Sequence, residues 1–278
     1  MAPPLRKSHY MQYRRCPKAF EYAYIIRPDV EFAKSSAADV GTEFHNRAQE
    51  VFNKFDINVA RSLVSENVPK YIRSLMPEST DELDAMFWNF ANHEARRFTF
   101  GKDAGYTVED MQKYFIPVEQ ELAINWDGLQ FPLQGHVDRI DRMKRTNCYC
   151  VTEYKTSKKL NIPELRKETG FYANILNHTN YLDMPAHYWS VYDPRIDQFH
   201  IERFSPMTLR AVDNGLQKLF NKIAAGGPFP RKITPLCLWC SYDTECLWAN
   251  DDVDIHELPS ELISKKENKK SSGSKNEV

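Results

Sequence analysis

The chain has 278 residues, of which 42% are hydrophobic and 27% are charged. Such a chain can bury a sizeable core in one or two domains, which excludes collagen-like, wholly disordered and disulfide-scaffold proteins. It contains no run of about 18 apolar residues, so we expect no membrane partner. The N-terminal sequence MAPPLRKSHYMQYRR lacks the apolar centre of a secretory signal, and we therefore expect a cytoplasmic protein.

The charged residues nearly balance, with 37 basic and 38 acidic side chains and a formal net charge of -1. This excludes a protein that is basic over its whole surface, so any contact with nucleic acid must come from a local patch. Six cysteines in a reduced chain are more informative through their grouping than through their number. Cys148 and Cys150 alternate along an apolar run and are expected in the core.

The predicted elements change from helices to strands and back along the chain. We expect one domain over residues 1–264, with a helical part at about 41–100 and a sheet core at about 113–204, followed by a disordered lysine-rich tail at 265–278. Asp127-Gly128 predicts a turn. The individual segments are strands at Lys113–Asn125, Leu129–Arg142 and Cys148–Thr156, one or two strands at Tyr188–Phe204, and helices at Pro163–Leu176 and Thr208–Ala225.

Two neighbouring strands carry side chains that suit phosphodiester hydrolysis. In VTEYKTSKK, Glu153 and Lys155 are two residues apart and so point to one face of a strand. Asp138, in GHVDRID, can reach them across a meander. The carboxylates, with the backbone carbonyl of Tyr154, would hold a hard divalent cation, and the lysine would stabilise the attacking water or the charge on phosphorus.

The Glu-x-Lys pattern alone is weak evidence, because exposed strand faces often carry alternating charges. Gly135 and Asp138 on one strand and His45 in GTEFH make the combination more informative. His136 shares a strand face with Asp138 and is a rival metal ligand, although the spacing in GTEFH favours His45.

A second group of candidate ligands is formed by cysteines. Cys237, Cys240 and Cys246 have the spacing C-x2-C-x5-C, and three thiols within ten residues of a reduced chain indicate a metal. Cys16, in YRRCPKAFEYAY, is the candidate for the fourth ligand of a closed site. The spacing allows either zinc or a 4Fe-4S cluster.

Taken together, GTEFH, GHVDRID, TEYKTSKK and a helix containing ETGFYANIL resemble the RecB-like branch of the PD-(D/E)XK nuclease superfamily, which includes the AddB nuclease domain, exonuclease V and the CRISPR-adaptation exonucleases. The resemblance extends over about Ser8–Trp248. It implies an α/β fold with a restriction-endonuclease-like core, a central mixed sheet flanked by helices, and a helical N-terminal part clasped by a metal cluster. It also implies His45, Asp138 and Glu153 as ligands of Mg²⁺ or Mn²⁺, and Lys155 as a catalytic residue.

The family's Gln-x-x-x-Tyr motif lines the DNA path, and Tyr172 matches its tyrosine while Glu168 stands in place of the glutamine. A carboxylate accepts hydrogen bonds but offers no amide donor, so Glu168 would approach the metal or a cation, or would be an exposed helical residue. Arg15 and Lys158 are candidates to follow DNA phosphates, with Tyr172 stacking on bases. The alternative is a solvated charged face and a core tyrosine.

The resemblance also selects a 4Fe-4S cluster over zinc, with Cys16, Cys237, Cys240 and Cys246 as a structural clasp that ties the two chain ends together. We therefore expect a metal-dependent DNA exonuclease that acts on single strands or DNA ends with 5'-to-3' polarity. Because no Gly-x-x-x-x-Gly-Lys-Ser/Thr loop is visible, a helicase, a recombinase or a CRISPR integrase are candidate partners. The pathway is recombination, repair, viral DNA metabolism or CRISPR adaptation.

Two alternatives belong to other functional classes. One is a non-catalytic DNA-binding or adaptor protein that is stabilised by a cysteine-ligated metal cluster. The other is a redox sensor whose cluster changes oxidation state. Intact Asp138, Glu153 and Lys155 favour the enzyme over the adaptor, whereas metal analysis and redox titration would separate the redox sensor from a structural clasp.

Overall fold

The computed structural model describes residues 4–29, 36–79, 81–156, 159–248, 258 and 260–261. The chain divides into two compact units. The first unit comprises Met1–Lys7 and Lys34–Gly215, and the second comprises Ser8–Ala33 and Leu216–Val278. The helices that the structure describes are all too short or too polar to cross a membrane.

The first unit is built on a six-stranded sheet with the order β1-β3-β4-β5-β6, to which β2 is added by pairing with β3. The pairs β1–β3 and β4–β5 are parallel, whereas β2–β3, β3–β4 and β5–β6 are antiparallel. This confirms the predicted mixed central sheet. The strands are β1 (Leu5–Arg6), β2 (Glu119–Trp126), β3 (Leu133–Met143), β4 (Cys148–Tyr154), β5 (Ala186–Asp193) and β6 (Gln198–Arg203).

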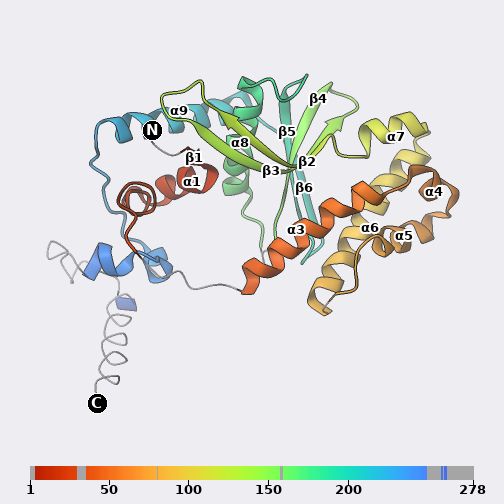
Figure 1. Cartoon of the computed structure of the whole chain (residues 1–278), viewed down its shortest axis with the longest axis horizontal. Coiled ribbons are helices and arrows are strands. Elements are labelled where there is room, and N and C mark those ends of the chain that lie inside the picture. Colours follow the sequence, from red (N-terminus) through yellow and green to blue (C-terminus); the bar gives the residue numbers. More distant parts are fainter. Residues whose placement is uncertain are drawn as a thin grey trace, which may run out of the picture. The chain divides into compact units, whose positions relative to one another are not determined.

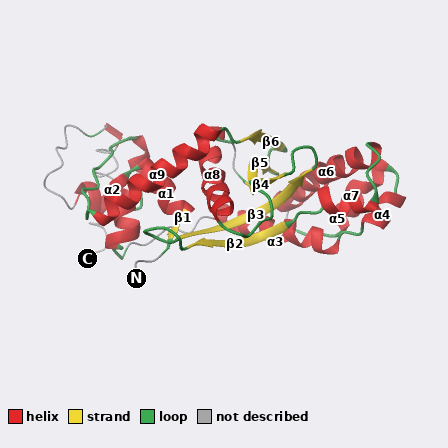
Figure 2. Cartoon of the chain, turned by 90° about the horizontal axis from the view of Figure 1, so that it is seen from above, coloured by secondary structure: helices red, strands yellow, loops and turns green. Residues whose placement is uncertain are grey.

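Helices cover both faces of this sheet, as predicted (Figures 1 and 2). Helix α8 packs against β2, β3, β4 and β5. The remaining helices surround a core in which Phe44 and Phe90 meet Tyr154 of β4. The helices of the first unit are α3 (Ser36–Lys54), α4 (Ile57–Ser62), α5 (Val68–Ser74), α6 (Asp81–Asp103), α7 (Val108–Tyr114) and α8 (Ile162–His178), with a 3-10 turn at Ser65–Asn67.

The predicted strand at Lys113–Asn125 is wrong over its first residues, because Val108–Tyr114 is helix α7. A capping box starts this helix: the backbone N–H of Asp110 donates to Thr107 Oγ1 at 3.0 Å, and the N–H of Thr107 donates to the Asp110 carboxylate at 3.2 Å. Two otherwise unsatisfied helix donors are paired in this way, which stabilises a helix of only seven residues. Strand β2 therefore begins at Glu119.

The second unit contains segments from both ends of the chain. Tyr22, from the N-terminal segment, stacks on Tyr242 with ring centroids 5.6 Å apart and donates a hydrogen bond of 2.9 Å to the carbonyl of Glu245. Helix α9 (Pro206–Ala224) runs from the first unit into the second. The other elements are α1 (Lys7–Arg15), whose first residue, Lys7, belongs to the first unit, α2 (Pro17–Phe20), π-helical turns at Glu21–Ile26 and Thr244–Trp248, and a 3-10 turn at Pro235–Trp239.

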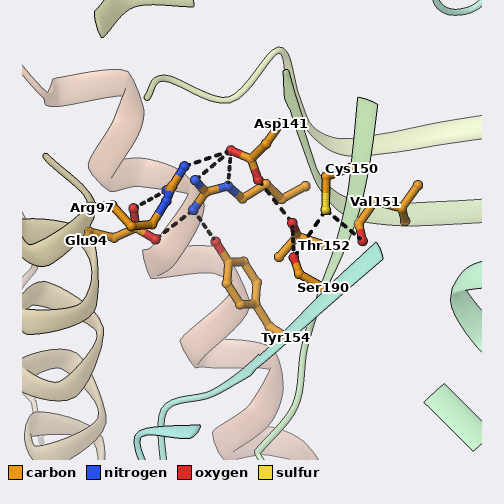
Figure 3. Close-up of polar contacts among 9 residues, drawn as sticks. Glu94, Arg97, Asp141, Cys150, Val151, Thr152, Tyr154 and Ser190 are labelled. Carbon is orange, nitrogen blue, oxygen red and sulfur yellow. Dashed lines mark hydrogen bonds and ion pairs between the residues drawn. The ribbon is translucent and has the colours of Figure 1, made fainter. Parts of the chain in front are cut away.

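A buried polar network joins α6 to the sheet (Figure 3). Arg139 on β3 is 2% exposed. Its guanidinium donates to Glu94 at 2.7 Å, to Asp141 at 2.7 Å and to the hydroxyl of Tyr154 at 3.2 Å. Thr152 then links Asp141 to β5 through Ser190. Since removing one partner of a buried ion pair costs roughly 3–5 kcal/mol, this network fixes β3 and β4 against α6.

His93 lies next to this network, and its titration predicts how the stability of the protein depends on pH. His93 is buried and stacks on Tyr192 with centroids 4.2 Å apart. Burial lowers the pKa of His93 to about 4, from 6.5 in the unfolded chain. As pH falls from 6.5 to 4, the unfolded chain binds a proton that the folded protein does not, so stability falls over this window by up to about 3 kcal/mol.

The variant His93→Phe keeps an aromatic ring at this position and removes the titrating group. We expect its free energy of unfolding, measured with urea at several pH values, to fall less than that of the wild type between pH 6.5 and 4. Carboxylates that lie far from His93 and titrate in the same range affect both proteins equally. Parallel curves for the two proteins would show that His93 is not the group responsible.

Candidate metal centre and active site

The pairing of β3 with β4 brings Asp138 and Glu153 together. Arg139 is paired with Thr152, and continuing this register by one residue sets Asp138 opposite Glu153. The backbone N–H of Tyr154 donates to Asp138 Oδ2 at 2.7 Å, which fixes the carboxylate. Side chains alternate along a strand, so Tyr154 enters the helical core while Glu153 points to the opposite face of the sheet.

Three side chains from three elements could together hold one metal ion. The ligand atoms of His45 on α3, Glu121 on β2 and Asp138 on β3 all lie within 4.8 Å of one another. The His45 Nδ1 atom is 3.5 Å from Asp138 and 4.0 Å from Glu121. One imidazole and two carboxylates are donors that suit Mn²⁺ or Mg²⁺.

The electrostatics of this group favour a bound cation. Burial and the negative charge of Asp138 raise the pKa of Glu121. Burial lowers the pKa of His45, but hydrogen bonding to Asp138 and the charges of Asp138 and Glu121 outweigh it and raise the pKa overall. Both shifts show that negative charge is crowded here, and a divalent cation would relieve that crowding.

Glu153 adds a further candidate ligand beside this group. It is 3% exposed, and its Oε1 atom accepts hydrogen bonds from Lys155 at 2.7 Å and from Lys7 at 2.6 Å. Its Oε2 atom is buried and has no hydrogen-bond partner within the described part of the chain. Although burial opposes ionisation, the two ammonium groups hold the pKa of Glu153 below its usual value. A buried, ionised carboxylate with one unsatisfied oxygen fits a metal ligand.

Helix α8 completes the site with Glu168 and Tyr172. The Glu168 carboxylate is 3.0 Å from Lys155 and 3.5 Å from Lys7. The ring of Tyr172 packs so closely on β3 that a Cβ atom at Gly135 would come within 2.9 Å of it. Gly135 is therefore required for Tyr172 to approach the strand.

The structure thus brings together most of the residues that the sequence predicts for the active site, namely His45, Asp138, Glu153, Lys155, Glu168 and Tyr172. His136, the rival ligand, lies 3.1 Å from Glu121, and more than half of its side chain is exposed. Coordination by the carbonyl of Tyr154 stays a prediction. Lys158 lies outside the described residues, and Arg15 belongs to the second unit.

Sequence reasoning missed Glu121 and Lys7. Glu121 lies on β2 where the register aligns it with Asp138, between the pairs Gln120↔Arg139 and Leu122↔Val137. The sequence does predict that β2 pairs with β3. However, a tight turn at Asp127-Gly128 would have given this pair a different register, in which Glu121 is not opposite Asp138. Lys7 follows β1, whose two residues are too few to give a periodic pattern.

The four predicted cysteine ligands lie together in the second unit. A cavity of about 380 Å³ is lined by Cys16, Cys237, Cys240 and Cys246, and also by Arg15. Burial raises the pKa of Cys240, and it raises the pKa of Cys246 to about 11. These thiols would therefore stay protonated at neutral pH unless a metal stabilised the thiolates, a requirement that a cysteine-ligated metal meets.

The family model of the PD-(D/E)XK nuclease superfamily matches residues 7–247. The chain belongs to this superfamily. Its members are typically metal-dependent nucleases. The sequence resemblance assigns the reactive centre to Asp138, Glu153 and Lys155, which lie on β3, on β4 and directly after β4, and this assignment stays a prediction.

The other comparisons add little to this assignment of the PD-(D/E)XK nuclease. No curated protein matches the sequence. The solved structure of SSO0001 is similar over 87% of this chain and 85% of its own, with 12% sequence identity and a TM-score of 0.34. We draw no functional conclusion from a similarity at this level.

The metal centre of this PD-(D/E)XK nuclease predicts the effect of a charge-neutral substitution. Glu121→Gln should weaken Mn²⁺ binding about ten- to hundredfold in isothermal titration calorimetry, because one of the carboxylates near the ion is lost. Glu119→Gln is a matched control, since this exposed glutamate lies two residues earlier on β2. Equal affinities for the two variants would remove Glu121 from the metal site.

Proposed function

We propose that the protein is a metal-dependent DNA exonuclease that acts on single strands or DNA ends. The observation that carries this proposal is the position of the buried Glu153 carboxylate. One of its oxygens is held by Lys155 and Lys7, the other has no hydrogen-bond partner within the described part of the chain, and the β3–β4 register sets the residue opposite Asp138. Metal ligands and a cationic donor thus adjoin each other, as phosphodiester hydrolysis requires.

Each side chain has a distinct role in the proposed reaction. His45, Glu121, Asp138 and Glu153 would hold Mg²⁺ or Mn²⁺, which supplies Lewis-acid activation of water and of the scissile phosphate when bound. Lys155 would stabilise the charge that develops on phosphorus. Tyr172 would position the DNA strand. Its ring is held in place by close packing on β3 at Gly135.

The finer features of the function rest on the sequence resemblance to RecB-like nucleases. We propose 5'-to-3' polarity and a role in recombination, repair, viral DNA metabolism or CRISPR adaptation. A helicase, a recombinase or a CRISPR integrase would supply the opened strand. Arg15 and Lys158 would add contacts to DNA phosphates.

We also propose that Cys16, Cys237, Cys240 and Cys246 hold a structural 4Fe-4S cluster. Support comes from the cavity that all four cysteines line. The choice of a cluster over zinc rests on the sequence resemblance, since both accept four thiolates.

The second candidate function is a non-catalytic DNA-binding or adaptor protein stabilised by the cysteine-ligated metal. It keeps the proposed cluster but gives the sheet carboxylates no chemical task. The grouping of His45, Glu121 and Asp138 within 4.8 Å, next to the lysine-bound carboxylate of Glu153, favours the enzyme, since a binding protein has no need of metal ligands at this place.

The first test is the degradation of 5'- or 3'-labelled linear single-stranded DNA with Mg²⁺ or Mn²⁺, using protein purified without oxygen. We expect the linear strand to be degraded and a circular single strand to survive. Asp138→Ala and Lys155→Ala should each lower the rate by at least about a hundredfold without unfolding the protein. The labelled end that is released first gives the polarity.

The other outcomes separate the alternatives. Cutting of the circle as well would identify an endonuclease with the same chemistry. DNA that is bound but never cut by folded, metal-loaded protein would identify the adaptor, and retained activity in Lys155→Ala would remove Lys155 from the mechanism.

The cluster proposal predicts that Cys246→Ser lowers the iron content and the absorbance near 400 nm of anaerobically purified protein. The thermal midpoint should fall as well, because the cluster would cross-link distant parts of the second unit. Cys148→Ser is the control, since Cys148 is buried in β4 and does not line the cavity. If metal analysis found zinc in place of iron in a protein of unchanged stability, the cluster proposal would be wrong. The four cysteines would then bind a single zinc ion.

A further inference from the structure

Lys7 and Lys155 form a matched pair of cations in the active site. Both ammonium groups contact Glu153 Oε1, at 2.6 and 2.7 Å, and both lie near Glu168 Oε2, at 3.5 and 3.0 Å. Lys7 Nζ also lies 4.9 Å from the ring centroid of Tyr172. Lys7 therefore has the same acidic neighbours as Lys155, although the two lysines are far apart in the sequence.

Strand β1 holds Lys7 at this position. Leu5 is fully buried and pairs with Leu133 of β3, and its N–H donates to the carbonyl of Pro132 at 2.8 Å. Arg6 pairs with Gln134. Because the chain enters the sheet in this way, the Lys7 side chain emerges beside the strand segment that leads to Asp138.

The balance of charge at the site explains why a second lysine is needed. Glu121, Asp138, Glu153 and Glu168 contribute four negative charges. A divalent cation and one lysine contribute three positive charges, so one negative charge would remain. A DNA phosphodiester would then be repelled from its own site. With Lys7 the four carboxylates are balanced, and an incoming phosphate meets no net negative charge.

We propose that Lys7 is a second phosphate-binding residue of the active site, and that it is required because Glu168 places a carboxylate beside the DNA path. This inference rests on the proposed nuclease function. Lys7 and Lys155 would bind the non-bridging oxygens of the same backbone phosphate, and Glu168 would orient both ammonium groups.

The test is a comparison of affinities for a short single-stranded oligonucleotide, measured by fluorescence anisotropy with Ca²⁺ in place of Mg²⁺ to limit cleavage. Lys7→Met, which keeps the length of the side chain and removes its charge, should weaken binding about tenfold. It should also make the slope of log affinity against log salt shallower by about 0.7, the value for one phosphate contact on a single strand.

Three further variants separate a phosphate contact from a structural role. Lys7→Arg should retain most of the affinity, and Arg6→Met, which makes the same charge change on the neighbouring residue, should leave it unchanged. Glu168→Gln should tighten binding, because it removes a negative charge. The double variant Lys7→Met/Glu168→Gln should return to within about threefold of the wild type, since the charge balance is restored.

The outcomes distinguish this inference from the proposed function. If the wild type neither binds nor cuts DNA, the nuclease proposal fails. If the wild type binds and cuts but Lys7→Met binds as tightly as Arg6→Met, only the role of Lys7 is excluded. A loss in Lys7→Met that Glu168→Gln does not reverse would also overturn the phosphate contact, because it would indicate structural damage.

Discussion

The crowding of carboxylates on one face of the sheet is the constraint on which the rest of the site depends. Glu121, Asp138, Glu153 and Glu168 converge there, and two such charges 4 Å apart repel by about 4 kcal/mol at an effective dielectric constant of about 20. Two groups of side chains reduce this repulsion. Lys7 and Lys155 neutralise Glu153 and Glu168, and His45 approaches Asp138 and Glu121. The charge that remains lies on Asp138 and Glu121, whose ligand atoms lie within 4.8 Å of each other and of His45, and this is where a divalent cation is favourable.

Such a site needs a rigid support, and the opposite face of the same strands provides it. Alternation along β4 sends Thr152 and Tyr154 into the helical core while Glu153 faces the acidic group. Alternation along β3 likewise sends Arg139 into the buried network with Glu94 and Asp141. Because that network ties both strands to α6, the carboxylates cannot move apart to relieve their repulsion. The network lies on the opposite face from the carboxylates. It stabilises the strands that carry them and so keeps the carboxylates close enough together to bind a metal ion.

The sequence predicts the mixed sheet and most of the side chains of the site, because these depend on local signals. Two-residue spacing places Glu153 and Lys155 on one face, and helical periodicity identifies the segments that carry His45 and Tyr172. What it missed depends on long-range geometry. Asp127-Gly128 suggests a tight hairpin, but the connection from Trp126 to Leu133 is longer, and this shift in register is what brings Glu121 to Asp138. Lys7 reaches the site through a two-residue parallel strand that no periodicity can reveal, and the capping box of α7 overrode a strand-like pattern at Lys113.

The charge balance also constrains the order of events at the proposed active site. Before a cation is bound, the four carboxylates exceed the two lysines, and a phosphodiester would add a further negative charge to that excess. Both ammonium groups are then committed to Glu153 Oε1. If Asp138 and Glu153 shared their charge with a divalent cation, Glu153 would hold the two lysines less tightly, and both ammonium groups would be available to a phosphate. Metal loading should therefore precede productive DNA binding, because the same carboxylate that recruits the ion also holds the two lysines that the phosphate needs.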